Sequence, residues 1–264
     1  MTRPIVFLTD YGLSDPWVGI CHGVMYGIAP EAHVIDLTHA VPRQDVMRGA
    51  IELGRAIEYL PPEAVYLGVV DPGVGSERRA AAVAAGPALL VGPDNGVLSL
   101  AWEALGGADE AVWIENEALL LTPVSRTFHG RDVFAPAAAH LAAGRPLSDL
   151  GPSVDPAVLR RLEMPSPMVA PGKVGARVMG IDGFGNVQLN ATLRELRSAG
   201  ADAGRVLVVN GRRLPRAGTF AELPEHEPGM IVDSEGFLAL VVNHGSAAAT
   251  MRLSAGDTVV VERP

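Results

Sequence analysis

An aspartate and an arginine stand seven residues apart in the segment "GVVDPGVGSERRA", residues 68–80. Asp71 follows an apolar, strand-like run, and a proline and two glycines turn the chain before Arg78. Turn chemistry alone explains an aspartate after a strand, because its side chain caps the backbone that follows. A guanidinium this close to the carboxylate also fits a ligand site, so both interpretations need a second observation.

Asp10 supplies that observation, because it ends another strand-like run, "PIVFLT". Ligands of α/β proteins bind beyond the carboxyl ends of parallel strands, where loops converge on a rigid sheet. Two acidic strand ends in one sheet therefore favour a site. A third, Asp94, lies in a Pro-Asp-Asn-Gly turn, for which capping is a sufficient explanation. Residues 73–75 read G-x-G, but Arg78 takes the place of the third glycine of a dinucleotide motif.

His129 is the one histidine that the sequence places in a cluster of charges. In "SRTFHGRD", residues 125–132, it is surrounded by Arg126, Arg131 and Asp132 at the start of a predicted helix. A helix cap with a surface ion pair is the alternative to a catalytic role. Three other histidines fall within or beside predicted elements and are expected to be structural: His22, His33 and His140. No H-x-H or H-E-x-x-H spacing occurs, so we expect neither a metal site nor a cofactor.

An aromatic side chain stands at the tip of a predicted hairpin in "GIDGFGNVQLN", residues 180–190. The glycines and the asparagine are typical of a turn and require no ligand. Exposing Phe184 is costly, however, and stacking on a planar base would explain it. Asp182 and Asn186 flank it on the same loop.

Strand-like and helix-like segments alternate through the first half of the chain, which predicts an α/β domain with a mostly parallel sheet. The expected strands are 4–10, 33–38, 64–71, two around Gly86-Pro87, and 111–116; the expected helices are 15–30, 44–60, 95–107 and 131–144. The last third contains short β-runs and one helical stretch, 191–200, which predicts a smaller all-β, barrel-like domain. We place the domains at 1–155 and 171–264, with a proline-rich linker at 156–170.

Composition limits the class of partner. The 264 residues are 48% hydrophobic and 19% charged, as in a globular protein, and the net charge is −9. An acidic chain disfavours nucleic acid and anionic membranes as partners. No apolar run approaches the roughly 20 residues that a membrane span needs. The single cysteine, Cys21, excludes an internal disulfide, so we expect a cytoplasmic protein with a small-molecule ligand.

Six segments together resemble the S-adenosyl-L-methionine (SAM) hydrolase family, also called SAM hydroxide adenosyltransferases. They are "LTDYG", "GVVDPGVGSERR", "GPDNGVL", "RTFHGRDVFAPAAAHLAAG", "DGFGNVQLN" and "SEGFLALVVNHGSAA". The resemblance implies hydrolysis of SAM to adenosine and L-methionine by a homotrimer with ligand sites between subunits. It places the catalytic set at Asp71, Arg78 and His129, with Arg78 chosen over Arg79 from the family spacing, and the ribose-binding acid at Asp10. The implied adenine and methionine contacts are Asp182, Phe184, Asn186, Ser234, Glu235 and Asn243, with Tyr11 and Asp15 beside the first ligand loop.

The nucleophile has to be decided from residues, because halogenating relatives share this resemblance. Where this sequence reads "TFHGRD", the fluorinating enzymes resemble "TFYSRE", and they have a tyrosine in place of Asp71. Gly130 has no hydroxyl with which to hold a halide. Two like charges about 4 Å apart cost roughly 4 kcal/mol at an effective dielectric constant near 20, so a carboxylate favours water over halide. The alternatives are a halide transferase, a SAM-binding sensor without turnover, and a metal phosphoesterase built on Asp10, Asp71 and His129.

Overall fold

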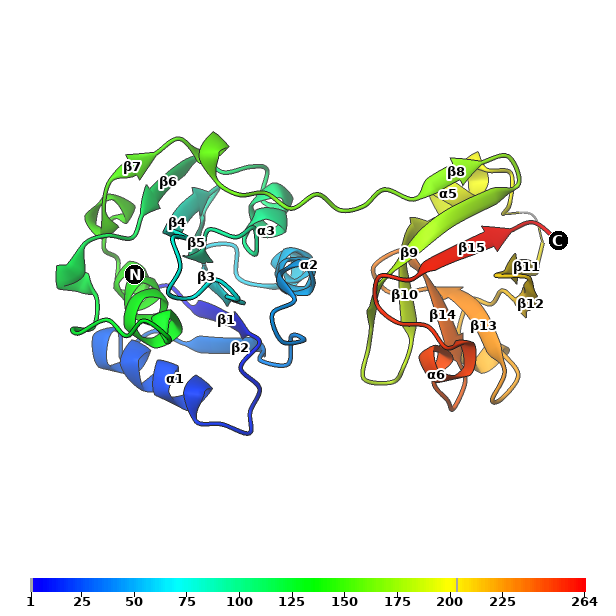
Figure 1. Cartoon of the computed structure of the whole chain (residues 1–264), viewed down its shortest axis with the longest axis horizontal. Helices are drawn as coiled ribbons and strands as arrows, with labels where there is room; N and C mark the ends of the chain where they lie inside the picture. The colour runs from blue at the N-terminus through cyan, green and yellow to red at the C-terminus, as the bar shows by residue number, and fades with distance from the viewer. Residues whose placement is uncertain (1, 203) are drawn as a thin grey trace. The chain divides into compact units, whose positions relative to one another are not determined.

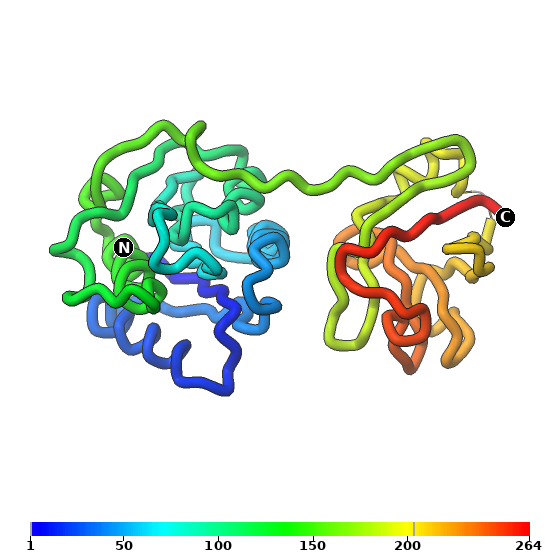
Figure 2. Tube along the Cα trace, viewed as in Figure 1, coloured from blue at the N-terminus to red at the C-terminus, as the bar shows by residue number. Residues whose placement is uncertain are grey.

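The structure is a computed structural model that describes residues 2–202 and 204–264. The chain forms two compact units, one that ends at Leu162 and one that begins at Glu163 (Figures 1 and 2). This division falls inside the proline-rich segment 156–170, whose first residues form a 3-10 turn and whose last residues form a short strand.

A seven-stranded sheet forms the centre of the first unit, with the strand order β2-β1-β3-β5-β4-β6-β7. Its strands are β1 (Ile5–Thr9), β2 (Val34–Thr38), β3 (Val65–Val69), β4 (Ala80–Ala85), β5 (Ala88–Pro93), β6 (Glu110–Trp113) and β7 (Ser153–Val154). The sheet is mixed. The pairs β1-β2, β1-β3 and β3-β5 are parallel, whereas β4-β5, β4-β6 and β6-β7 are antiparallel.

The expectation of a mostly parallel sheet is therefore corrected. Gly86 adopts a positive φ of 53° and, with Pro87, closes a two-residue hairpin between β4 and β5. A connection this short can join only antiparallel strands, because a parallel pair needs a crossover of a dozen or more residues. The parallel half contains β1 and β3, whose ends carry Asp10 and Asp71.

Helices cover both faces of this sheet (Figure 1). They are α1 (Trp17–Ile28), α2 (Val46–Ala56), α3 (Ser99–Ala104) and α4 (Ala135–Ala142), with shorter turns η1 (Ile57–Tyr59), η2 (Glu117–Leu119), η3 (Gly130–Phe134), η4 (Leu147–Leu150) and η5 (Pro156–Val158). Strand β1 is buried on both sides: Ile5 and Phe7 belong to the core under α1 and α4, and Val6 and Leu8 to the core under α2 and α3. Burial on both sides explains why β1 reads as a continuous apolar run.

The second unit is an antiparallel, nearly closed sheet with the strand order β12-β11-β15-β9-β10-β14-β13, and β8 also pairs with β9. Its strands are β8 (Met168–Ala170), β9 (Lys173–Ile181), β10 (Val187–Thr192), β11 (Val206–Val209), β12 (Arg212–Pro215), β13 (Pro228–Val232), β14 (Phe237–Val242) and β15 (Thr258–Glu262). An isolated bridge between Arg216 and Met230 joins the two ends of this order. The barrel-like prediction fits this topology.

Two short α-helices accompany the barrel where the sequence predicted one. Helix α5 (Leu193–Ser198) lies within the expected range, and α6 (Ala247–Met251) was missed; a 3-10 turn, η6 (Phe220–Glu222), is also present. Helix α6 is only five residues long, too short for an apolar periodicity, and Ser246 caps it by accepting a hydrogen bond from the Ala249 N–H.

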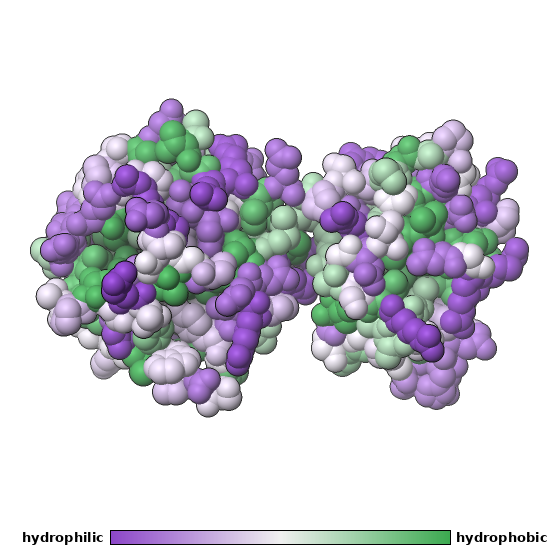
Figure 3. Space-filling view, in the orientation of Figure 1, coloured by the Kyte–Doolittle hydropathy of each residue, from purple (hydrophilic) through white to green (hydrophobic). Residues whose placement is uncertain are grey.

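Hydrophilic and hydrophobic residues are interspersed over each unit on the face seen in Figure 3. The exposed large apolar side chains include Leu13, Tyr26, Tyr59, Met168 and Phe184. Within residues 2–202 and 204–264, the helices are all too short or too polar to cross a lipid bilayer.

Glu195 gives the second unit an acid-sensitive contact. Its Oε2 accepts hydrogen bonds from the Thr192 N–H at 2.9 Å and the Thr192 hydroxyl at 2.6 Å, and Thr192 caps α5 in return. Burial opposes ionisation, but these hydrogen bonds outweigh it and lower the pKa of Glu195 from 4.5 to about 2. The carboxylate therefore stabilises the fold above pH 4.5, and this contribution is lost as the pH falls towards 2.

We expect Glu195→Gln to flatten the acid side of the stability profile. The difference in urea midpoint between neutral pH and about pH 3 should be smaller than in the parent chain, because the variant has no carboxylate to protonate. Glu227→Gln, an exposed change in the same unit, is the control and should keep the parent profile. An unchanged acid dependence in Glu195→Gln would contradict the assignment.

Candidate active site

Arg78 joins Asp71 and His129 through one guanidinium group. Its Nε donates to both Asp71 carboxylate oxygens, at 2.9 and 3.1 Å, and its terminal nitrogen also contacts Asp71 Oδ2. The same terminal nitrogen lies 2.8 Å from His129 Nδ1. The structure therefore brings together the three residues that the sequence assigned to the catalytic set. Arg78 and His129 are 51 residues apart in the chain.

This contact decides the protonation of His129. Arginine has only donors, so His129 Nδ1 must accept and a neutral ring carries its proton on Nε2. Burial, and then the positive charge of Arg78, lower the pKa of His129 below 6.5, which favours the neutral ring. The side chains of Arg78 and Asp71 are only 9% and 7% exposed, so their ion pair is largely shielded from water. The site thus presents an ionised carboxylate beside an imidazole N–H.

Two glycines allow the turn that brings Arg78 back to Asp71. A Cβ on Gly75, whose φ is 76°, would lie 2.4 Å from the Arg126 carbonyl oxygen, and a Cβ on Gly73 would lie 3.2 Å from Arg78 Cγ. Asn95 holds the strand end, because its side-chain amide donates to the Val70 carbonyl at 2.8 Å. Asn95 was not among the predicted site residues, although "PDNG" placed it beside a strand end.

Arg79, the other arginine of the segment, points away from this group. It donates to Glu115 at 2.9 Å and its guanidinium carbon lies 5.2 Å from the centroid of the Trp113 ring. Its side chain is 56% exposed, compared with 9% for Arg78. The guanidinium carbon of Arg78 lies instead 5.1 Å from the centroid of Phe134. Of the two adjacent arginines, which immediately precede β4, only Arg78 therefore reaches Asp71.

His129 stands immediately before η3, a single π-helical turn. Buried Asp132 holds the preceding loop in place, because its Oδ2 accepts from the Ser125 N–H at 2.8 Å and its Oδ1 from Arg131 Nε at 2.5 Å. Burial opposes ionisation of Asp132, but the hydrogen bonds from Arg131 and Ser125 outweigh it and lower its pKa. The predicted helix 131–144 is thus a π turn followed by α4, and such turns are frequent at functional sites.

Tyr11 packs directly against Gly130. An added Cβ on Gly130 would lie 1.9 Å from the Tyr11 hydroxyl oxygen, so the site has no space for a side chain at position 130. The ring of Tyr11 meets Phe128 edge to face, with centroids 5.8 Å apart, and Trp17 also contacts Phe128 edge to face, at 5.4 Å. Burial, together with the charges of Asp10 and Asp71, raises the pKa of Tyr11 well above 10, so it is a neutral phenol.

Asp10 lies at the end of β1, as predicted. Its Oδ2 accepts a hydrogen bond from the Gln44 backbone N–H at 2.8 Å, and Gln44 has a positive φ of 65°. This contact fixes the orientation of the carboxylate. Asp15, the weaker prediction, is exposed at the start of α1. Asp94 accepts from the Arg160 N–H at 2.8 Å, a contact with a distant segment, whereas its neighbour Asn95 caps the following backbone by accepting from the Val97 N–H at 3.1 Å.

In the second unit, the loop between β9 and β10 is organised around Asp182. Its Oδ1 accepts from the backbone N–H groups of Phe184 and Asn186, both at 2.9 Å, and its Oδ2 accepts from the Asn186 side chain at 2.7 Å. Phe184 is 82% exposed. Gly185, with a φ of 83°, packs on Ser246 so closely that a Cβ would lie 2.1 Å from its hydroxyl. The loop is therefore preformed and presents one bare aromatic ring.

The remaining predicted residues do not form one group. Ser234 and Glu235 lie in the β13–β14 turn, where Glu235 accepts from Gln188 Nε2 at 3.1 Å. Asn243 follows the far end of β14, and its carbonyl accepts from the His226 N–H at 2.9 Å. The whole length of β14 separates them, so within one unit they cannot contact the same part of a ligand.

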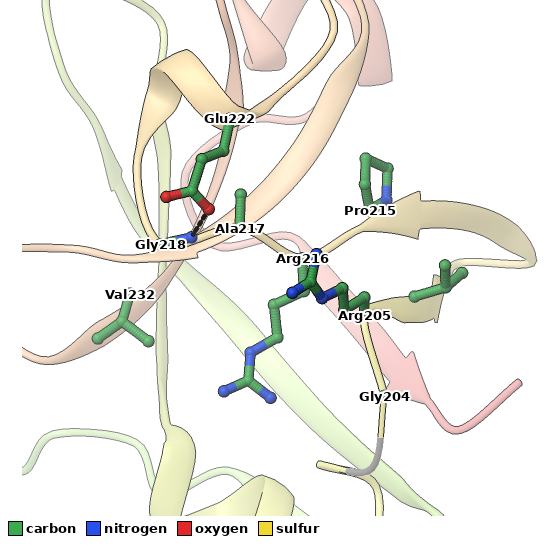
Figure 4. Close-up of a pocket in the computed structure, with 9 residues that line it drawn as sticks. Gly204, Arg205, Pro215, Arg216, Ala217, Gly218, Glu222 and Val232 are labelled. Carbon is green, nitrogen blue, oxygen red and sulfur yellow. Dashed lines mark hydrogen bonds between the residues drawn. The ribbon is translucent and has the colours of Figure 1, made fainter.

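A broad pocket also occurs in the second unit (Figure 4). Arg205, Arg216 and Glu222 are among its lining residues, and the Glu222 carboxylate accepts from the Gly218 N–H at 3.0 Å. The described residues that line this pocket include none of the predicted site residues.

Comparison with known proteins gives the family. The SAM hydroxide adenosyltransferase N-terminal domain matches residues 5–151, and the C-terminal domain of the same family matches residues 176–260. The chain belongs to the SAM hydroxide adenosyltransferase family. It is 51% identical to the (R)-S-adenosyl-L-methionine hydrolase of Salinispora arenicola over 97% of each chain. A fluorinase of an Actinoplanes species is 29% identical over 98% of this chain and 97% of its own.

A solved structure of similar fold comes from Thermotoga maritima. It is described as an uncharacterized conserved protein, is 37% identical to this chain, and covers 98% of it and 100% of its own length with a TM-score of 0.89. The resemblance inferred from the six sequence segments is thus confirmed at the level of the family.

Gly130 provides a steric test of the site. We expect Gly130→Ala to destabilise the first unit by about 1–3 kcal/mol, because the new Cβ would overlap the Tyr11 hydroxyl. In a Tyr11→Phe background the penalty should be smaller, since the nearest remaining atom is Tyr11 Cζ at 3.0 Å. Urea unfolding of the four chains of this double-mutant cycle measures the coupling.

Gly27→Ala is the matched control, because Gly27 lies in α1 and a Cβ there meets nothing within 4 Å. It should be neutral or slightly stabilising. Strict additivity of the Gly130 and Tyr11 substitutions would show that the two residues are not in contact.

Proposed function

We propose that this protein hydrolyses SAM to adenosine and L-methionine. The observation that carries the proposal is the Asp71–Arg78–His129 arrangement at the strand ends of the first unit. The identity to a (R)-S-adenosyl-L-methionine hydrolase over almost the whole chain supports it.

The reaction requires little from the protein beyond positioning a water molecule in line with the bond that breaks. The sulfonium of SAM already gives the 5′ carbon a good leaving group, so a water oxygen can form a bond to that carbon while the carbon–sulfur bond breaks. The bonding pair leaves on sulfur, giving neutral L-methionine, and the water loses one proton. Holding reactants in line can supply about 7–11 kcal/mol of the barrier. In this proposal neither a metal nor a cofactor takes part.

We assign different roles to the two groups that face the water. Asp71, paired with Arg78, is ionised and accepts the proton. Arg78 itself cannot accept it, because a guanidinium has only hydrogen-bond donors. His129 directs the water by donating from Nε2, since Arg78 occupies its Nδ1. Arg78 is a positioning residue for both.

Ligand binding is proposed for the remaining residues. The Asp10 carboxylate would take the two ribose hydroxyls, as strand-end acids do in nucleotide folds. The exposed Phe184 ring offers a stacking surface for adenine, with Asp182 and Asn186 holding its loop. Ser234, Glu235 and Asn243 stay predicted contacts of the adenine and methionine parts, and Tyr11 and Asp15 stay the weaker predictions. A cytoplasmic homotrimer with sites between neighbouring subunits completes the proposal.

A halide transferase is the second candidate, because a fluorinase is among the relatives. Two features favour water. Asp71 would repel an anion at the nucleophile position, and the Tyr11 hydroxyl occupies the space in which a side chain at position 130 would stand.

Product chromatography tests the proposal. Incubation with SAM should yield adenosine and L-methionine, unchanged in fluoride or chloride and in the presence of a chelator. Asp71→Asn should lower turnover about 10²–10⁴-fold and still bind SAM, because the amide keeps the shape but cannot accept the proton. Asp149→Asn is the matched control, since Asp149 also pairs with an arginine but is exposed.

A 5′-halo-adenosine product would replace the proposal with the second candidate. Tight SAM binding with no adenosine after long incubation would identify a sensor, and loss of turnover with chelator would favour a metal phosphoesterase. Parental turnover in Asp71→Asn would show that Asp71 has another role.

Asp10 should act on binding rather than on the chemical step. We expect Asp10→Asn to raise the KM for SAM tenfold or more with a smaller change in kcat, because charged hydrogen bonds contribute about 1.5–3 kcal/mol each. The amide oxygen can still accept from Gln44, so the loop keeps its shape. Asp109→Asn is the control, since Asp109 also accepts from a backbone N–H. A fall in kcat with unchanged KM would contradict the binding role.

A further inference from the structure

Two imidazoles converge on one carboxylate at the edge of the first sheet. His22 Nε2 lies 2.8 Å and His39 Nε2 lies 3.0 Å from Asp36 Oδ1. Their side chains come from α1, from β2 and from the segment that follows β2. Because the ligands come from separate elements, no motif spacing in the sequence reveals the cluster. The sequence pattern around His22 had predicted only a structural role for this residue.

His39 is the buried member of this cluster, and its Nε2, the ring nitrogen that faces Asp36, makes no hydrogen bond. The His39 side chain is 2% exposed, and its Nε2 is within ion-pair distance of Asp36 but makes no hydrogen bond. Its other nitrogen, Nδ1, lies 2.9 Å from the Thr9 hydroxyl. If Nδ1 donates to Thr9, the Nε2 lone pair points into the cluster. Histidine ligands of metals are held in this way, with the second ring nitrogen donating to an oxygen.

The geometry suits a small divalent ion. The three ligand atoms all lie within 4.8 Å of one another. Bonds of about 2.0–2.2 Å in a tetrahedral site separate ligand atoms by roughly 3.3 Å. The two contacts with Asp36, at 2.8 and 3.0 Å, would open by a few tenths of an ångström to admit the ion, and the two imidazoles would approach each other by side-chain rotation. Phe7 lies beneath the cluster, with its ring centroid 4.8 Å from that of His39 and 6.0 Å from that of His22.

One side of the cluster is open to solvent. The side chains of His22 and Asp36 are 35% and 44% exposed, and a cavity lined by His22, Tyr26 and His33 adjoins it. Water can therefore supply the remaining coordination positions. Two imidazoles and one carboxylate form a donor set that zinc, cobalt and other divalent transition metals accept.

We propose that His22, Asp36 and His39 bind a divalent transition-metal ion of the zinc class. The site is separate from the proposed hydrolysis, in which no metal takes part. Its place in the fold gives it a mechanical consequence, because the His39 carbonyl accepts from the Gly12 N–H at 2.7 Å and the His39 ring contacts Thr9. Bound metal would thus tie α1 and β2 to the residues on either side of Asp10.

Cobalt is the probe, because its visible absorption reports coordination directly. The full chain without a histidine tag is stripped with chelator, dialysed and titrated with CoCl₂. We expect saturable binding of one equivalent with a visible band that ZnCl₂ abolishes, and a rise in melting temperature on binding. His22→Ala and Asp36→Asn should each weaken cobalt binding tenfold or more. Both side chains are partly exposed, so these variants are expected to fold.

His226→Ala is the matched control, since His226 is an exposed histidine of the second unit, and it should bind cobalt as the parent does. The proposal is overturned if the parent shows no saturable cobalt band, or if His22→Ala and Asp36→Asn bind cobalt as tightly as the parent. None of these readouts depends on turnover, so they test the metal site independently of the hydrolase proposal.

Discussion

The guanidinium of Arg78 is the group on which the candidate active site depends. One side chain satisfies Asp71 through both carboxylate oxygens and His129 through Nδ1. Removing one partner from a shielded ion pair leaves an uncompensated charge, which is far more costly than losing the contact itself. Asp71 and Arg78 therefore fix each other. His129 then has a single tautomer, because its neighbour can only donate.

Close contacts at two glycines, Gly75 and Gly130, leave no space for a side chain at either position near Arg78. The Arg126 carbonyl lies against Gly75, and the Tyr11 hydroxyl lies against Gly130. The first contact brings the turn after β3 against the loop that leads to His129, and the second presses the end of β1 onto the π turn. Two strand-end segments and the loop that leads into the π turn are thus held together, one contact involving the Arg126 backbone and the other the Tyr11 side chain. This explains why glycines stand among the charged residues of these segments.

Local sequence identified the elements and the strand-end acids but not the directions of the strands. The run 80–93 shows two apolar stretches around Gly86-Pro87, and the mixed character of the sheet follows from the shortness of that connection rather than from the stretches themselves. The contact between Arg78 and His129 spans 51 residues, and no spacing rule predicts it; only the family resemblance placed the two together. The cluster of His22, Asp36 and His39 was not predicted from the sequence for the same reason. Residues on separate elements meet through topology, which single-sequence patterns do not encode.

In the proposed function, the choice between water and halide would depend on a contact between Tyr11 and Gly130 as well as on Asp71. Gly130 lacks a hydroxyl, and in addition the Tyr11 hydroxyl occupies the space that a side chain at position 130 would need. A side chain at position 130 would require Tyr11 to move, and Tyr11 is itself packed on Phe128. A changed nucleophile therefore requires a repacked pocket as well as the loss of the Asp71 charge. Because substitutions at contacting residues are not additive, we expect the glycine, the tyrosine and the aspartate to act together on the choice of nucleophile in the proposed hydrolase.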